Sequence, residues 1–124
     1  MRRISVVKLP VTDLERSKRF YSQGLGLKLG AEVFSPEMEP SGALFNFSGE
    51  SADLQLDRVP ALGEGSRNVL VAMEVEAGTN LVDLLEQLEK LGGQVKTREP
   101  RTPGLLVVTL VDPDGNYLEL LIQQ

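Results

Sequence analysis

The chemistry open to this sequence is restricted, because it contains no histidine and no cysteine. It therefore has no imidazole base, no thiol nucleophile and neither of the side chains that most often bind zinc. Carboxylates, lysines, amides and two tyrosines are the groups left for proton transfer or ligand contact. We expect no metal centre built on histidine or cysteine, and no disulfide framework.

The composition is that of a globular domain, with 124 residues of which 41% are hydrophobic and 25% charged. The net charge is −5, and no basic tract with interleaved aromatic residues occurs, so we expect no nucleic-acid partner. The acidity fits a cationic ligand or plain solubility. No apolar run approaches the roughly 20 residues that span a membrane, and no signal-peptide core occurs. These features favour a cytoplasmic protein without a membrane partner.

The first half of the chain is expected to form a strand, a helix and three further strands. A β-branched run precedes a capping box in which Thr12 is the N-cap and Glu15 the third helical residue. Gly24 and Gly26 end the helix. The predicted elements are strands at 4–11, 28–34, 43–48 and 52–58, a helix at 13–23, and turns at 36–42 and 49–51.

The second half repeats this order. Gly78-Thr79 opens a helix and Gly92-Gly93 ends it. Four leucines in this helix fall at i, i+3, i+4 and i+7 and form an apolar stripe: Leu81, Leu84, Leu85 and Leu88. Asp112-Pro113-Asp114-Gly115 is typical of a type I turn. The predicted strands are 68–76, 94–98, 105–111 and 116–122.

Two copies of one strand and helix order at a nearly constant offset indicate that a single unit was duplicated. We therefore predict an α+β fold of two tandem βαβββ modules within one domain, 1–124. The modules are expected at about 1–59 and 67–124. Residues 60–66, rich in Pro, Gly and Ser, are the expected linker.

Two stretches resemble the vicinal oxygen chelate superfamily, which includes glyoxalase I, bleomycin-resistance proteins and extradiol dioxygenases. The first is Leu9-Pro10-Val11-Thr12-Asp13-Leu14-Glu15-Arg16-Ser17, followed by Phe20-Tyr21 and Leu25-Gly26-Leu27. The second is Asp112-Pro113-Asp114-Gly115-Asn116-Tyr117-Leu118-Glu119-Leu120. The resemblance covers essentially the whole chain. It implies that each module curls into an open half-barrel, with helices on the convex side and one cleft lined by both modules, a fold that hosts many activities.

The resemblance also implies where a metal would bind, because metal-dependent members place one ligand, usually His or Glu, on each of four strands. The matching positions here hold Val6, Gln55, Leu70 and Glu119. Val6 and Leu70 have no donor atom, so the three or four protein ligands of a catalytic Zn²⁺, Ni²⁺ or Fe²⁺ are not available. We therefore predict no metal and no cofactor, which disfavours glyoxalase I and dioxygenase activity.

Strand alternation within the implied fold assigns side chains to the core or the cleft. Glu119, the candidate catalytic residue, could act as a general base or acid, could only contact a ligand, or could be neutralised by Lys8. Lys8 could instead bind an anionic group or pair with Glu74. Asp53, Asp57 and Glu74 could hold Mg²⁺ or Ca²⁺, or form the solvated rim of the cleft. The predicted ligand-binding residues are Val6, Lys8, Gln55, Asp57, Leu70, Glu74, Tyr117, Glu119 and Leu121.

Two further features concern the surroundings of the cleft. The run 105–111 is apolar on both faces, so one face is core and the other is a cleft wall or a contact with a second subunit. Members of the superfamily often dimerise, so we expect a homodimer. The loops 34–42 and 99–104 are long enough to act as lids.

The first functional hypothesis is a metal-independent protein that binds a small, partly apolar, neutral or cationic molecule, with antibiotic sequestration as one version. The alternative is a metal-free lyase or isomerase with Glu119 as general base and Gln55 or Lys8 steadying an oxyanion. A glyoxalase-type metalloenzyme with carboxylate ligands ranks after these two. Nothing in the sequence argues specifically for a regulatory module.

Overall fold

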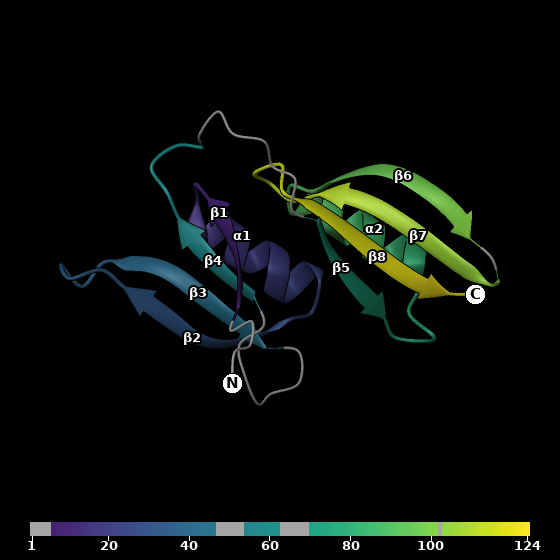
Figure 1. The fold of residues 1–124 in the computed structure, drawn as a ribbon, viewed down its shortest axis with the longest axis horizontal. Coiled ribbons are helices and arrows are strands. Elements are labelled where there is room, and N and C mark those ends of the chain that lie inside the picture. The colour runs from purple at the N-terminus through teal and green to yellow at the C-terminus, as the bar shows by residue number, and fades with distance from the viewer. Residues whose placement is uncertain (1–5, 47–53, 63–69, 102) are drawn as a thin grey trace, which may run out of the picture. The chain divides into compact units, whose positions relative to one another are not determined.

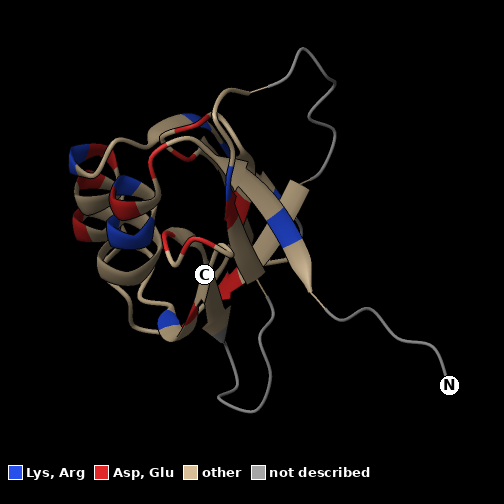
Figure 2. Cartoon of the chain, turned by 90° about the vertical axis from the view of Figure 1, so that its left-hand side faces the viewer, with Lys and Arg blue, Asp and Glu red and all other residues tan. Residues whose placement is uncertain are grey.

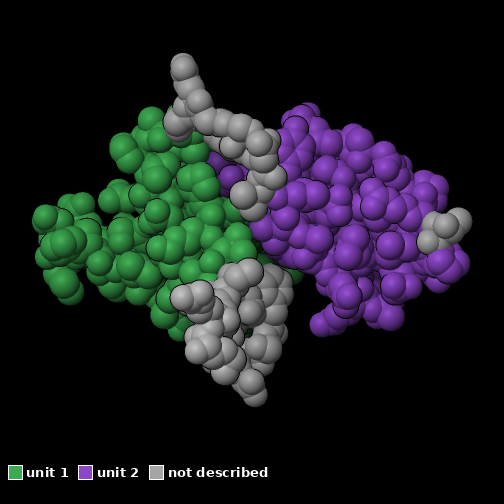
Figure 3. All heavy atoms as spheres, viewed as in Figure 1, with its two compact units in different colours: residues 1–64 green, residues 65–124 purple. Residues whose placement is uncertain are grey.

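The computed structural model describes residues 6–46, 54–62, 70–101 and 103–124. The chain forms two compact units, residues 1–64 and 65–124 (Figure 3). Each unit holds one four-stranded sheet and one helical segment (Figure 1). We describe each unit by itself and call it a module.

The first module follows the predicted order of elements. Its strands and helix are β1 (Val7–Val11), α1 (Leu14–Arg19), a π-helical turn (Phe20–Gly24), β2 (Lys28–Phe34), β3 (Pro40–Asn46) and β4 (Leu54–Arg58). The strands are ordered β1-β4-β3-β2 in the sheet. β1 pairs with β4 in parallel, and the other neighbours are antiparallel.

The second module repeats this arrangement. Its elements are β5 (Leu70–Val75), α2 (Leu81–Lys90), β6 (Gln94–Arg101), β7 (Leu105–Val111) and β8 (Tyr117–Gln123). The sheet order is β5-β8-β7-β6, with β5 parallel to β8 and the other pairs antiparallel. The predicted α+β fold of two βαβββ modules is therefore confirmed, and neither sheet closes into a barrel.

Both helices begin one or more residues later than predicted. Asp13, not Thr12, caps α1, since its Oδ1 accepts a hydrogen bond of 3.1 Å from the Arg16 amide. Asn80 caps α2, and its Oδ1 accepts a 3.1 Å bond from the Asp83 amide. The sequence offers several polar residues in a row at each helix start. Which of them caps is decided by the backbone angle at which the chain enters the helix.

Both predicted lid loops are shorter than expected because neighbouring strands extend into them. β3 starts at Pro40, and β6 continues to Arg101 through Pro100. Proline is tolerated at the first residue of a strand and on an edge strand, where it interrupts no ladder bond. The hairpin between β2 and β3 is thus reduced to Ser35–Glu39, where the Met38 amide donates to the Ser35 carbonyl at 2.9 Å.

The core of each module lies between its sheet and its helix. In the first module α1 packs on β3 and β4, and the Tyr21 ring lies 5.2 Å from that of Phe20 and 6.2 Å from that of Phe45. In the second module α2 buries Leu85 and Leu88. No described helix is long and apolar enough to cross a membrane. Both signs of charge lie along the helical ribbon, while most of the strand ribbon is uncharged (Figure 2).

Lys18 on α1 links the helix to the sheet. Its ammonium lies 2.8 Å from Glu15 Oε1 and also pairs with Glu32 on β2. The hydrogen bond to Glu15 first, and the one to Glu32 second, raise the pKa of Lys18 above its ordinary value of 10.5. The pairs therefore stabilise the fold fully below the unfolded-state pKa, and this stabilisation is lost as the pH rises through the higher folded-state pKa.

We predict that Lys18→Met lowers the free energy of unfolding by about 1 kcal/mol or less at neutral pH, because both acidic partners are partly exposed. The difference between variant and wild type should shrink once the pH exceeds 10.5. Urea unfolding of both proteins at neutral and alkaline pH measures this. A difference that grows with alkaline pH would contradict the assigned role.

Candidate functional site

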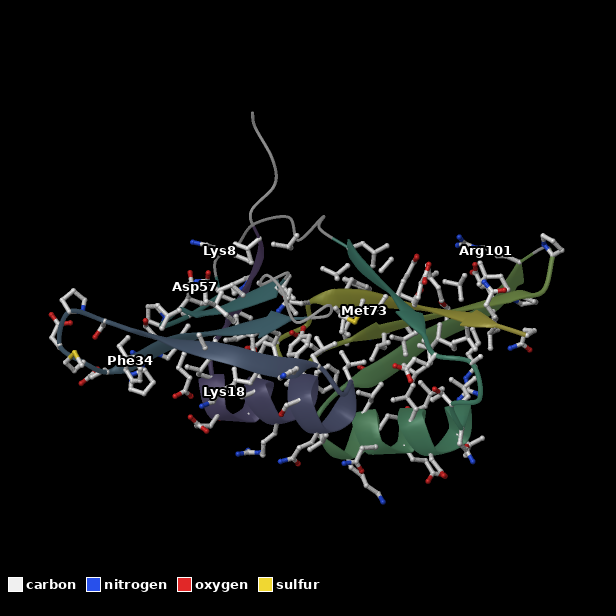
Figure 4. The ribbon with its side chains drawn as sticks, turned by 90° about the horizontal axis from the view of Figure 1, so that it is seen from below. Lys8, Lys18, Phe34, Asp57, Met73 and Arg101 are labelled. Carbon is white, nitrogen blue, oxygen red and sulfur yellow. The ribbon has the colours of Figure 1, made fainter. Side chains whose placement is uncertain are left out.

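The candidate site residues lie on the face of each sheet that is turned away from the module's own helix, which we call the open face. In the first sheet, Lys8 and Asp57 lie on the side opposite α1 (Figure 4). In the second sheet, Arg101 lies on the side opposite α2 (Figure 4). Successive side chains of a strand point to opposite faces of the sheet. The side chains on the other face of the first sheet are buried: Leu9, Val11, Ala43, Phe45, Leu54 and Leu56.

The register of the first sheet brings two predicted ligand-binding residues side by side. Lys8 on β1 pairs with Gln55 on β4, and Gln55 pairs in turn with Leu44 on β3. Lys8 is exposed and Gln55 half-buried. Val6 precedes β1 and is half-buried. The ammonium group of Lys8, the amide of Gln55 and the aliphatic side chain of Leu44 therefore lie in one row of this open face.

Asp57 lies one row further along, opposite Pro10 on β1 and Gly42 on β3. A side chain at Gly42 would place its Cβ 2.8 Å from the Leu56 carbonyl oxygen and 3.3 Å from Val33 Cβ. Gly42 is buried, and only glycine fits beside Asp57 at this position. Asp53, which the sequence analysis placed in a possible hard-cation site, lies outside the described residues.

The register of the second sheet brings together the remaining predicted residues. Leu70 on β5 pairs with Tyr117 on β8, Ala72 pairs with Glu119, and Glu74 pairs with Leu121. Leu70 and Tyr117 are 47% and 42% exposed, which is high for large apolar side chains. Glu119 and Leu121 are half-buried, and Glu74 is exposed. The open face of the β5–β8 pair therefore places an apolar pair and two carboxylates in three successive rows.

The turn between β7 and β8 fixes where Glu119 lies. Asp112 Oδ1 accepts bonds from the Asp114 and Asn116 amides at 2.9 and 2.8 Å, and its Oδ2 accepts one from Asn116 Nδ2 at 2.8 Å. The Gly115 amide donates to the Asp112 carbonyl at 2.9 Å, as expected for the predicted turn. Gly115 has a φ of 85°, a left-handed conformation that glycine adopts without strain.

The donor set does not fit the metal that the resemblance implies for related proteins. Val6 and Leu70, which the resemblance matches to two of the four ligand positions, have only carbon and hydrogen in their side chains. Within the described part of the chain, no group of three or more acidic side chains could hold a metal ion together. The described ion pairs in the second module do not include Glu74 or Glu119. The pairing of Lys8 with either glutamate stays a prediction.

The sheet register reveals two neighbours of the predicted site residues that the strand patterns alone do not indicate. Thr109 on β7 lies directly opposite Glu119, and Leu44 on β3 lies directly opposite Gln55. Thr109 was part of a run interpreted only as apolar on both faces. The signal that could have identified it is that Thr109 is the one polar residue between Leu105 and Val111.

Comparison with known proteins agrees with this fold. The family model for the Glyoxalase/Bleomycin resistance protein/Dioxygenase superfamily matches residues 3–120. A lactoylglutathione lyase of Salmonella typhimurium is 31% identical over 121 residues, which cover 91% of this chain and 87% of the relative. A lactoylglutathione lyase of Escherichia coli O157:H7 is 32% identical over the same shares of both chains. The chain therefore belongs to the glyoxalase/bleomycin resistance protein/dioxygenase superfamily.

Solved structures support the same assignment. A glyoxalase-related enzyme from Fulvimarina pelagi has a TM-score of 0.72 at 28% identity, over 99% of this chain and 89% of its own. The fosfomycin resistance protein FosX from Listeria monocytogenes has a TM-score of 0.71 at 18% identity, over 100% of this chain and 95% of its own. At this low identity the likeness to FosX shows the fold alone.

Proposed function

We propose that this protein binds a small, partly apolar organic molecule on the open face of its second sheet, without a metal. The observation that carries the proposal is the exposed Leu70–Tyr117 pair in the row next to Glu119. Ligand sites typically combine apolar side chains with a few polar groups that fix orientation, and this face has both. The aliphatic residues at two of the family's metal-ligand positions support a metal-free mode of binding.

Glu119 is the polar anchor in this proposal. We predict that Glu119→Gln weakens binding by roughly 10–100-fold, because a hydrogen bond to a charged group contributes about 1.5–3 kcal/mol. The matched control is Glu86→Gln, which removes the same charge from an exposed position on α2 of the same module. Ligands are first found by a thermal-shift screen of small amines, alcohols and apolar metabolites, and affinities are then measured by calorimetry.

The open-face location is tested with the same ligands. Bound molecules should shift the methyl NMR signals of Leu70, Ala72 and Leu121, which share this face. Hits that bind Glu119→Gln and wild type equally well, or that shift none of these methyl signals, would refute the proposal.

A metal-free lyase or isomerase with Glu119 as general base is the second candidate. Two observations favour it: the curated relatives are lactoylglutathione lyases, and Glu119 is half-buried between Tyr117 and Leu121 on its strand. Turnover that persists in Glu119→Gln would exclude it. We also propose that the protein is cytoplasmic, as its composition favours, and that it forms a homodimer, as the resemblance implies.

A further inference from the structure

A polar row crosses the open face of the second sheet. Glu119 on β8 is flanked by Ala72 on β5 and by Thr109 on β7, and Thr109 is followed by Thr97 on β6. The rows on either side place Tyr117 against Val111 and Leu121 against Val107. A carboxylate and a hydroxyl therefore lie next to each other within a mostly apolar centre of the sheet.

Thr109 differs from the rest of its strand. The other six residues of β7 are leucine or valine. Val107 and Val111, its neighbours on the same face, are 1% and 9% exposed, whereas Thr109 itself is half-buried. A hydroxyl in such surroundings has little access to water, so a hydrogen bond it forms with a ligand is stronger than the same bond in water.

Both polar groups are available to a ligand. Among the described residues, neither the Thr109 hydroxyl nor the Glu119 carboxylate has a hydrogen-bond partner or ion-pair partner, and the two do not bond to each other. The methyl group of Ala72, opposite Glu119, is too small to cover the carboxylate. Thr109 and Glu119 are direct cross-strand neighbours, a relation that places Cβ atoms about 4.5–5.5 Å apart.

The charge of this face favours a cation. On the open face of β5 and β8 the charged side chains are Glu74 and Glu119, both acidic. The described cations on the same sheet lie on the edge strand β6, where Arg101 lies 3.8 Å from Glu99 and Lys96 donates to Gln94 at 3.2 Å. A positively charged ligand group is therefore attracted to the β5–β8 side of the sheet and meets no like charge there.

We propose that Thr109 is a second ligand contact and that, together with Glu119, it selects ligands carrying a protonated amine next to a hydroxyl group. The inference deepens the proposed function and depends on it. The ammonium donates to the Glu119 carboxylate, and the neighbouring hydroxyl exchanges a hydrogen bond with Thr109 Oγ1. Rows on one face of a strand are about 7 Å apart, so an apolar body on the same ligand reaches Leu70 and Tyr117.

Three probes with a common phenyl group separate the two contacts. These are 2-amino-1-phenylethanol, 2-phenylethylamine, which lacks the hydroxyl, and 1-phenylethanol, which lacks the amine. Affinities are obtained by NMR titration of the Leu70, Ala72 and Leu121 methyl signals in wild type, Thr109→Val and Thr97→Val. Valine has the shape of threonine and suits a strand, so both variants should fold, and circular dichroism checks that they do.

We expect the amino alcohol to bind the wild type roughly 3–10-fold more tightly than the amine, the range that one neutral hydrogen bond supplies. Thr109→Val should abolish this preference and leave the affinity for the amine within about 2-fold. Thr97→Val, whose exposed side chain lies two strands away from Glu119, should retain the preference.

Three results would overturn the inference. The first is an amino alcohol preference that survives in Thr109→Val. The second is binding of the alcohol as tight as that of the two amines, and the third is no methyl shift with any probe. The proposed function is judged separately by the ligand screen: hits of another chemical class that depend on Glu119 would preserve it while this inference fails.

Discussion

Replacement of Phe45 by alanine is expected to lower the free energy of unfolding by about 3–5 kcal/mol, the usual cost of removing a buried aromatic side chain. Phe45 lies on β3 and is fully buried. Its ring lies 6.2 Å from that of Tyr21, which packs edge-to-face on Phe20. The substitution leaves a cavity where α1 and its π-helical extension meet the sheet, and this site has little freedom to collapse.

The matched control is Phe34→Ala on the neighbouring strand β2. Phe34 is 48% exposed, so its loss should cost about 1 kcal/mol or less. Urea unfolding followed by circular dichroism measures both variants against wild type. If Phe34→Ala destabilised the protein as much as Phe45→Ala, burial of the side chain would not account for the contribution of Phe45.

Replacement of Asp112 by alanine is expected to lower the free energy of unfolding by about 3 kcal/mol. Asp112 is 2% exposed and accepts three hydrogen bonds from Asp114 and Asn116, which are also buried. Alanine leaves these donors without their acceptor, and each buried unsatisfied group costs about 1–3 kcal/mol. Because this turn leads into β8, we also expect weaker ligand binding at Glu119.

Asp57→Ala is the control, since Asp57 is exposed and no described residue pairs with it. Its effect on stability should stay within about 0.5 kcal/mol. Thermal and urea unfolding of both variants provide the comparison. Equal stability of Asp112→Ala and wild type would show that the turn does not depend on this carboxylate.

The fold could be predicted from the sequence because its signals are local and occur twice. Alternation within the strands and the leucine stripe of α2 indicated the element order, and its repetition indicated two modules of the same kind. The errors lie at element ends, where local signals are ambiguous. The cap of α1 falls on Asp13 rather than Thr12, and β3 begins at Pro40 inside a predicted turn.

The site was predicted less completely, because it depends on which residues pair across strands. Glu119, Leu70 and Tyr117 could be identified from the resemblance and from alternation within single strands. Thr109 could not, because its position beside Glu119 follows from the β7–β8 register. That register is set by the turn at Asp112 and by packing between residues distant in sequence, neither of which a strand pattern contains.

The measurement that tests the central claim most directly is a calorimetric titration of the best ligand from the screen into three samples. These are wild type, wild type treated with EDTA and dialysed, and Glu119→Gln. A metal-independent site centred on Glu119 predicts equal affinity before and after EDTA and a roughly 10–100-fold loss in Glu119→Gln. Binding abolished by EDTA, or unchanged in Glu119→Gln, would contradict it.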